Sequence, residues 1–276
     1  MKWSWILILF LSSCDTEIPY KVIVYDDKIE EVSVTTIDSN LLLKVENIMT
    51  SIGLVELISI DSTVKIDLKY GTSGNFMGVQ LYDTLTRLFL QKNVAIRLSK
   101  SQRYLDSISP GYSLLVYDGV RPRQVQQEMW DALDSIPVNS RGKFVSNPRN
   151  GSVHNFGAAV DLTIVDANGD ILDMGAEYDD FREIAFPKYE ARFLKSGELT
   201  KQQYQNRKLL RRVMKYSSFY NIPSEWWHFN AYSRNKASHK YQMLLTESGE
   251  SMWFKIPFKT DSSSDSLTKP AQDAIN

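Results

Sequence analysis

The sequence predicts an α+β fold, in which a sheet is covered by helices. Strand-like segments cluster along the chain, and segments of helical periodicity flank these clusters. A doubly wound parallel sheet requires regular alternation of strand and helix, so it is not favoured. A chain of 276 residues, of which 43% are hydrophobic, is long enough to bury a sizeable core.

The first half of the fold is expected to contain two strands and two helices. Residues 64–68 alternate apolar and polar side chains, which is typical of a half-buried strand. Residues 81–106 carry apolar side chains at helical spacing and predict a helix. Residues 112–117 indicate a buried strand, and residues 121–133 indicate a helix with Pro122 in its first turn, where the missing N–H costs little.

The second half begins with a long loop over residues 135–152, rich in Pro, Asn, Arg and Gly, of a kind that is often functional. Residues 158–165 predict a strand that continues through a hairpin-type turn. Residues 200–220 form the clearest helical pattern, and Pro223 is expected to stop it. Residues 226–231 predict a last strand, and the chain has no internal repeats.

The N-terminus predicts export. Residues 3–11 form an apolar run after a lysine, too short to span a membrane and typical of a secretory signal over residues 1–13. Leu11-Ser-Ser-Cys14 resembles a bacterial lipobox, and Cys14 is the single cysteine of the chain, which excludes an intrachain disulfide. We therefore expect a lipoprotein, exported and membrane-anchored through lipidation at Cys14; the alternative is a plain signal peptide with an incidental cysteine.

Three further regions complete the predicted organisation. Residues 14–47 are expected to be a tether, residues 48–259 the folded domain, and residues 260–276, rich in Ser and Asp, a disordered tail. The formal net charge of −1 implies no bulk attraction to nucleic acid, so no nucleic-acid partner is expected.

The segment Gly151-Ser-Val-His-Asn-Phe-Gly-Ala-Ala-Val-Asp161 carries the strongest chemical signal. A turn at Gly157 would fold His154 back over the strand that carries Asp161, so that an imidazole and a carboxylate point at one spot, as a divalent metal requires. The alternative is a turn histidine and an aspartate that ends a loop.

Glu225-Trp-Trp-His228, far along the chain, supplies a candidate base and a candidate third ligand. The alternative is a core strand with two packed tryptophans. Simple alternation places Glu225 and His228 on opposite faces of a strand. Either Glu225 precedes the strand or a bulge intervenes.

These motifs resemble the zinc D-alanyl-D-alanine dipeptidases of the VanX type. The matching blocks run in the family's order from about residue 65 to about residue 258: Tyr70-Gly-Thr-Ser-Gly-Asn-Phe-Met-Gly78, Asp118-Gly-Val-Arg-Pro122, Ser152 to Asp161, Met174-Gly-Ala-Glu-Tyr-Asp179, Asn206-Arg-Lys-Leu-Leu-Arg-Arg-Val-Met214 and Glu225 to His228. The resemblance implies a central antiparallel sheet with flanking helices, as in the hedgehog and D,D-peptidase zinc folds, and one zinc ion (Zn2+) per chain.

The resemblance also implies roles for particular residues. The zinc ligands would be His154, Asp161 and His228. Glu225 would be the general base, and Arg121 would stabilise the oxyanion, although an arginine at a helix start can equally face solvent.

Three further residues match positions that recognise substrate in the family. Asp179 with Tyr70 would suit the ammonium group of a free dipeptide, and Ser152 its carboxylate side. Val153 stands where the family often has a second serine.

The implied function is zinc-dependent hydrolysis of the dipeptide D-Ala-D-Ala to two D-Ala, linked to peptidoglycan turnover. A first alternative is a D,D-carboxypeptidase or endopeptidase that acts on peptidoglycan stem peptides. The Trp226-Trp227 pair and the Tyr70 block favour the dipeptidase over this alternative. A second alternative is a non-catalytic cell-surface binding protein with the same fold.

Overall fold

The computed structural model describes residues 39–254 of the chain. The chain divides into two units, residues 1–44 and residues 45–276. The predicted signal peptide, the lipidation site at Cys14 and the predicted tail lie outside the described residues. Helix α1 (Ser39–Ser51) occupies the end of the segment for which a tether was expected. Among residues 39–254, no helix combines the length and the apolar character that crossing a bilayer requires.

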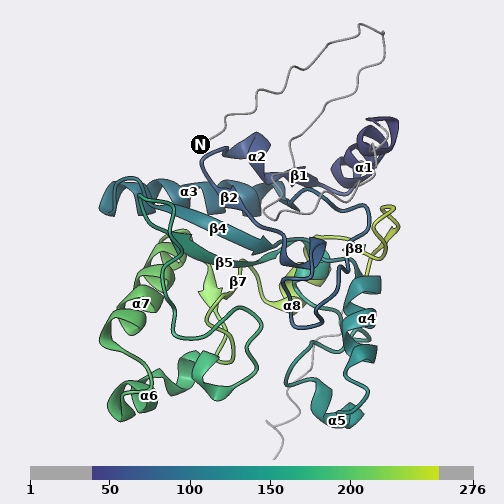
Figure 1. The fold of residues 1–276 in the computed structure, drawn as a ribbon. Coiled ribbons are helices and arrows are strands. Elements are labelled where there is room, and N and C mark those ends of the chain that lie inside the picture. Colours follow the sequence, from purple (N-terminus) through teal and green to yellow (C-terminus); the bar gives the residue numbers. More distant parts are fainter. Residues whose placement is uncertain (1–38, 255–276) are drawn as a thin grey trace, which may run out of the picture. The chain divides into compact units, whose positions relative to one another are not determined.

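The second unit combines short strands with helices in the order that Figure 1 shows. After α1, the elements are β1 (Leu54–Glu56), α2 (Leu57–Ile60), β2 (Lys65–Ile66), β3 (Phe89–Gln91), α3 (Lys92–Ile108), β4 (Ser113–Asp118), α4 (Arg123–Ala132), α5 (Val138–Arg141), β5 (Ala159–Val165), α6 (Glu190–Ser196), α7 (Lys201–Tyr216), β6 (Tyr220–Asn221), β7 (His228–Asn230), α8 (Arg234–Lys240), β8 (Met243–Leu244) and β9 (Ser251–Met252). Short 3₁₀ turns join several of them.

A five-stranded sheet in the order β2-β4-β5-β7-β6 organises this unit. The pairs β4–β5, β5–β7 and β6–β7 are antiparallel, and β2 adds a parallel pair at the edge of the sheet. The predicted α+β class is confirmed, because the sheet is mostly antiparallel and its helices do not alternate regularly with its strands.

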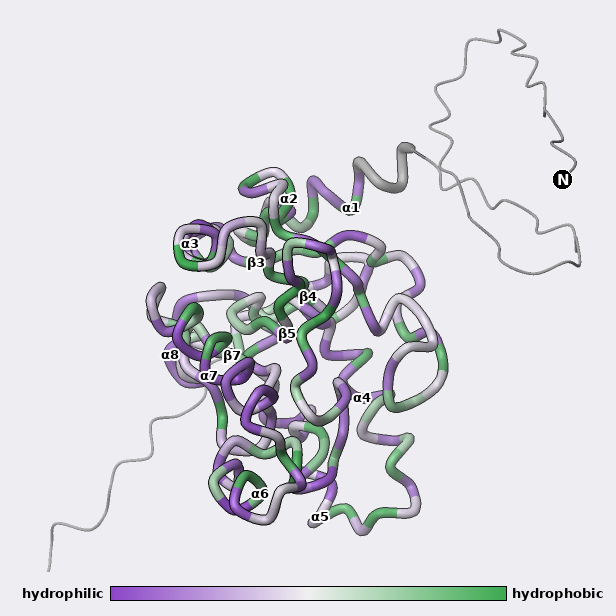
Figure 2. Tube along the Cα trace, turned by 60° about the vertical axis from the view of Figure 1, so that its left-hand side comes forward, coloured by the Kyte–Doolittle hydropathy of each residue, from purple (hydrophilic) through white to green (hydrophobic). Residues whose placement is uncertain are grey.

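The two faces of the sheet have different environments. Leu114 and Val116 of β4 lie opposite Ile164 and Leu162 of β5, and these side chains join the large core cluster with α3 and α7. The intervening residues of the same strands, including Asp161, point to the other face. Figure 2 shows β4 and β5 as a largely hydrophobic run. One face is therefore core, and the other is free to carry a polar site.

The strand register aligns three polar side chains across neighbouring strands. Asp118 at the end of β4 pairs with Asp161 of β5, after an irregularity that follows Val116, and Asp161 pairs with His228 of β7. Neighbouring strands lie about 4.8 Å apart, which is close enough for such a row of side chains to interact.

The expected turn at Gly157 is present and requires glycine. The residue has a φ of 62°, in the left-handed region, and follows a 3₁₀ turn at His154–Phe156. A Cβ at this position would collide with the side chain of Leu54. The chain can therefore reverse here, next to β5, only because the residue has no side chain.

Two expected helices were too long. Residues 81–91 are not helical: Glu247 accepts hydrogen bonds from the backbone N–H groups of Asp83, Thr84 and Leu85, and the segment ends in β3. The apolar residues of this segment fill a second core cluster instead. Helix α7 ends at Tyr216, not near Pro223, because the chain turns back through Ser218 (φ 63°) and pairs as β6.

The other expected elements are present with shifted bounds. The strand expected at residues 64–68 is only β2, and the strand expected at residues 226–231 is only β7. The loop over residues 135–152 contains the short helix α5. Pro122 directly precedes α4 as its N-cap residue.

Candidate active site

The structure brings the three predicted metal ligands together. His154 Nε2 lies 3.0 Å from His228 Nδ1 and 3.2 Å from Asp161 Oδ1, and His228 Nδ1 lies 2.9 Å from the same oxygen. All three side chains are buried. Asp161 and His228 face each other from paired strands, whereas His154 reaches the same point from the turn before Gly157.

In each imidazole, one nitrogen points to the shared point (the inner nitrogen) and the other points away from it (the outer nitrogen). The outer nitrogen of each ring faces an oxygen acceptor. His154 Nδ1 lies 2.7 Å from the backbone oxygen of Gly119, and His228 Nε2 lies 3.1 Å from Asn230 Oδ1. Each outer nitrogen therefore carries the proton in the neutral ring, and each inner nitrogen presents a lone pair to the shared point. Two lone pairs and a carboxylate oxygen at such distances repel one another unless a cation lies between them.

The spacing of these atoms fits a tetrahedral metal. Ligands about 2.0–2.2 Å from a zinc ion at tetrahedral angles are about 3.3–3.5 Å apart. The three separations found, 2.9 to 3.2 Å, need to widen by only a few tenths of an ångström. The outer acceptors match the usual pattern in which a metal-bound histidine donates its other N–H to a carbonyl or a carboxylate. His154, Asp161 and His228 can thus hold one divalent ion.

The neighbours of Asp161 favour its charged form. Burial raises the pKa of its carboxyl group, but His154 and His228 outweigh that effect and hold the pKa well below its usual range. The second oxygen of the group accepts hydrogen bonds from Arg121 (3.3 Å) and from the Tyr178 hydroxyl (3.2 Å). Asp161 is therefore ionised, with one oxygen held in place and the other directed at the two imidazoles.

Glu225 lies beside this cluster, at the edge of the cavity. Strand β7 begins at His228, so Glu225 precedes the strand, which is the first of the two arrangements considered for this pair. Its Oε2 lies 4.0 Å from His228 Nδ1. Burial, opposed by the attraction of His228, raises the pKa of Glu225 to about 7. A carboxylate with this pKa can both take up and release a proton near neutral pH.

Arg121 is buried and directs all of its N–H groups at protein acceptors. Nε and one terminal nitrogen bind Asp118 at 2.8 and 2.6 Å, and the latter nitrogen also binds Asp161. The other terminal nitrogen contacts Gln126 Oε1 at 3.2 Å and the sulfur of Met129 at 3.7 Å. Asp118 in turn accepts from the hydroxyl of Tyr82 at 2.7 Å. Asp118 thus fixes the orientation of the Arg121 guanidinium group.

The predicted substrate residues Tyr70 and Asp179 form a pair on one side of the cavity. The Tyr70 hydroxyl lies 3.2 Å from both carboxylate oxygens of Asp179. Burial and the nearby charge of Asp161 raise the pKa of Asp179 to about 7. Asp179 also has a φ of 60°, in the left-handed region. An added cation, such as a substrate ammonium group, would relieve the charge repulsion at this carboxylate.

Ser152 lies at the turn that leads into the cluster. Its hydroxyl accepts a hydrogen bond of 3.3 Å from the backbone N–H of His154, and its own N–H donates to Asn155 Oδ1 at 2.6 Å. Asn155 also donates to the backbone oxygen of Arg121 at 2.8 Å. The Ser152 side chain thus lies next to His154 and lines the cavity.

The loop that carries Asp179 is fixed by helix α7. Arg207, 1% exposed, donates to the backbone oxygens of Met174 (2.6 Å) and Ile184 (2.9 Å), which lie on either side of Asp179 in the chain. Asn206 binds the backbone oxygen of Asp173 at 2.8 Å. The block of α7 that matched the family therefore does not reach the cavity but holds the loop that does.

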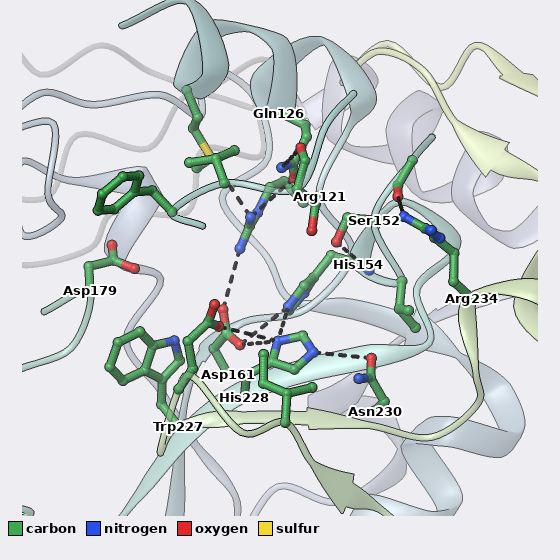
Figure 3. A pocket seen from close by; sticks show the side chains of 18 of the residues that line it. Arg121, Gln126, Ser152, His154, Asp161, Asp179, Trp227, His228, Asn230 and Arg234 are labelled. Atoms are coloured by element: carbon green, nitrogen blue, oxygen red, sulfur yellow. Dashed lines mark hydrogen bonds and ion pairs between the residues drawn. The ribbon is translucent and has the colours of Figure 1, made fainter. Parts of the chain in front are cut away.

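These side chains line a cavity of about 380 Å³. Figure 3 shows His154, Asp161 and His228 in its middle, with Asp179 and Arg234 on opposite sides. The predicted residues that line it are Tyr70, Arg121, Ser152, His154, Asp161, Asp179, Glu225 and His228. Trp227 lines the cavity as well, and Trp226 and Trp227 pack at 90° with ring centroids 5.5 Å apart.

Several residues of the site were not predicted from the sequence. Asn230 follows His228 by two positions on a strand, so the period of two could have placed both on one face. Tyr178, which binds Asp161, precedes the predicted Asp179 and gave no signal of its own. Gly119 acts through a backbone oxygen, which side-chain patterns do not reveal.

Replacing Asp179 by Asn should stabilise the fold at alkaline pH. In the folded protein the pKa of Asp179 is about 7, above its unfolded value, so the wild type loses stability as the pH rises from about 4 to above 7 and this buried group ionises. Asn carries no charge and tolerates a positive φ. We expect the melting temperature of Asp179→Asn to exceed that of the wild type by more at pH 8 than at pH 5. An equal difference at both pH values would contradict the prediction.

Comparisons with known proteins agree with this geometry. The model of the family described as D-ala-D-ala dipeptidase matches residues 50–244. The chain is similar to a D-alanyl-D-alanine dipeptidase of Escherichia coli, with 34% identity over 176 residues, 64% of this chain and 83% of that protein. Proteins of the same description from Synechocystis (30% identity; 51% of this chain, 68% of that protein) and Enterococcus faecalis (28%; 60% and 85%) are also similar. The chain belongs to the D-ala-D-ala dipeptidase family of metallopeptidases.

Proposed function

We propose that this protein is a zinc-dependent dipeptidase that hydrolyses D-Ala-D-Ala to two molecules of D-Ala. The convergence of His154, Asp161 and His228 on one point, with Glu225 4.0 Å from one of the imidazoles, carries this proposal. The names of the relatives supply the substrate. Two imidazoles and one carboxylate are a ligand set that suits zinc and leaves one position free in a tetrahedral site.

A zinc ion bound there supplies Lewis-acid chemistry, since it makes water more acidic and polarises a carbonyl group. Glu225 would take a proton from the attacking water and deliver it to the nitrogen of the leaving D-Ala. Its pKa of about 7 suits both steps, because the same group must accept a proton and then release it.

Arg121 would stabilise negative charge that develops on the scissile carbonyl oxygen. Its contact with the Met129 sulfur, 3.7 Å long, is the weakest of its interactions, and so this N–H can most easily turn to an oxyanion. Asp118 keeps the guanidinium group in place during this exchange through bonds of 2.6 and 2.8 Å.

The substrate ammonium group would lie at Asp179 and Tyr70. Phe76, Phe144 and Phe181 line the cavity with them, and the rings of Phe76 and Phe144 each lie 5.0 Å from the ring of Phe181. Three aromatic rings beside the ammonium site suit the end of a short peptide better than the polar backbone of a longer one, which favours a free dipeptide over a stem peptide.

An assay of D-Ala release tests the proposal. The purified protein loaded with zinc should hydrolyse D-Ala-D-Ala much faster than a stem pentapeptide that ends in D-Ala-D-Ala. Faster cleavage of the pentapeptide would identify a carboxypeptidase instead. Binding of zinc without hydrolysis of either substrate would favour a non-catalytic binding protein.

We also propose that the enzyme acts outside the cytoplasm, anchored in the cell envelope by lipid on Cys14. The apolar run before Ser12-Ser13-Cys14 supports this proposal. An enzyme in this place would recover D-Ala from peptidoglycan turnover. We expect Cys14→Ser to leave the membrane fraction and appear in the soluble envelope fraction of fractionated cells. A variant that stays in the membrane fraction as the wild type does would contradict the anchor.

A further inference from the structure

Arg234 lies on the side of the cavity opposite Asp179 and has no role in the mechanism described above. It is the first residue of α8 and lines the cavity together with Ser152 and Asn230. Figure 3 shows Arg234 on one side, Asp179 on the other, and the three candidate metal ligands between them. The cavity therefore has an acidic side and a basic side, separated by the proposed reaction centre.

The guanidinium group of Arg234 is available to a ligand. A terminal nitrogen donates a long hydrogen bond of 3.5 Å to the backbone oxygen of Gly151, and within residues 39–254 the group makes no ion pair. The other arginine that lines the cavity, Arg121, already binds Asp118, Asp161 and Gln126. Among the described residues, no carboxylate therefore balances the charge of Arg234 on the cavity wall.

The chemistry of the wall around Arg234 fits a carboxylate. A guanidinium group binds a carboxylate through two parallel N–H···O bonds, which a lysine cannot reproduce. Ser152 adds a hydroxyl group to the same wall, and the following residue, Val153, adds none. Its hydrogen bond to Gly151 holds Arg234 next to the turn that carries Ser152.

The charges at the two ends of a dipeptide match the two sides of the cavity. Two extended residues span about 7 Å, and a free dipeptide carries an ammonium group at one end and a carboxylate at the other. With the ammonium group at Asp179, the peptide bond would lie over the metal ligands and the carboxylate would point to Arg234.

We propose that Arg234 is the specificity residue that binds the C-terminal carboxylate of the substrate. This inference rests on the proposed function and deepens it, because it fixes the direction of the peptide in the cavity and requires a free C-terminus. A substrate whose C-terminal carboxylate is blocked loses this ion pair. The other interpretation, an arginine in solvent at a helix start, predicts no such requirement.

The first test measures binding without turnover. In a Glu225→Gln background, which is expected to bind the dipeptide without cleaving it, calorimetry with zinc present gives the dissociation constant for D-Ala-D-Ala. Adding Arg234→Gln should raise this constant by about 10–100-fold, the usual range for hydrogen bonds to a charged group. The dissociation constant of Arg234→Lys should lie between those of the parent protein and Arg234→Gln, because lysine keeps the charge and loses the paired bonds. Lys236→Gln is the control, because it removes the same charge from an exposed residue of α8 outside the cavity. It should leave the dissociation constant unchanged.

The second test compares D-Ala-D-Ala with its C-terminal amide. The wild type should prefer the free acid, and Arg234→Gln should lose most of that preference, mainly through an increase in KM for the acid. If Arg234→Gln binds and cleaves the acid as well as the wild type does, the inference is wrong. If the Glu225→Gln protein binds the dipeptide but the wild type cannot hydrolyse it, the proposed function fails, and the binding comparison still decides the role of Arg234.

Discussion

Replacing Glu225 by Gln should lower kcat for D-Ala-D-Ala by about 10²–10⁴-fold, the usual contribution of a general acid–base group. Gln has the same size but cannot accept the proton of the attacking water. Glu225 is not one of the three converging ligands, so the variant should still bind one metal ion per chain. Metal analysis and single-turnover kinetics on the same preparation measure both quantities.

The pH dependence gives a second measurement of the same role. Burial raises the pKa of Glu225 to about 7, and a divalent cation at the neighbouring ligands would lower it again by attraction. The base acts only when it is ionised, so kcat/KM of the wild type should rise with pH along an acidic limb whose midpoint lies at or below 7. This limb should be absent in Glu225→Gln. An unchanged limb in the variant would assign it to another group.

Replacing His154 by Ala should abolish metal binding at stoichiometric zinc. The residue supplies one of the three converging atoms, and even the loss of a hydrogen-bond partner of a ligand costs about 10–100-fold in metal affinity. We therefore expect a loss of more than about 100-fold in zinc affinity, together with the loss of dipeptide hydrolysis.

His239→Ala is the matched control for this experiment. It removes the same side chain from α8, where His239 bonds to the backbone oxygen of Asn235 and lies outside the cavity. The control should keep its zinc and its activity. A His154→Ala protein that retains one zinc ion per chain would show that the metal binds elsewhere.

Motifs in the sequence were sufficient to single out the three side chains that converge as candidate metal ligands, but the elements around them were harder to predict. The turn at Gly157 and the strand after it follow from local chemistry: a glycine with positive φ and a run of apolar residues. Periodicity failed over residues 81–91, where the backbone N–H groups of Asp83, Thr84 and Leu85 bond to Glu247, more than 150 residues away. No local pattern contains such a partner.

The positions of Glu225 and His228 show a second limit of structure prediction from local sequence patterns. Simple alternation would place them on opposite faces of a strand, and the sequence left open whether Glu225 precedes the strand or a bulge intervenes; in the structure, β7 starts only at His228. Strand bounds depend on the neighbouring strands, here β5 and β6, and these pairings are not encoded within the segment itself. Residues that act through backbone oxygens, such as Gly119, give no signal in a sequence motif, because every residue type has this oxygen.

The anchoring of the Asp179 loop by Arg207 links helix α7 to two parts of the proposed site. Arg207 holds the loop through the backbone oxygens of Met174 and Ile184, and the loop carries Asp179 and, next to it, Tyr178, whose hydroxyl bonds to Asp161. A substitution in α7 that shifts this loop would therefore displace the proposed ammonium partner and the support of a candidate metal ligand at the same time. Substrate preference and metal affinity are thus expected to respond together to changes in a helix that does not reach the cavity.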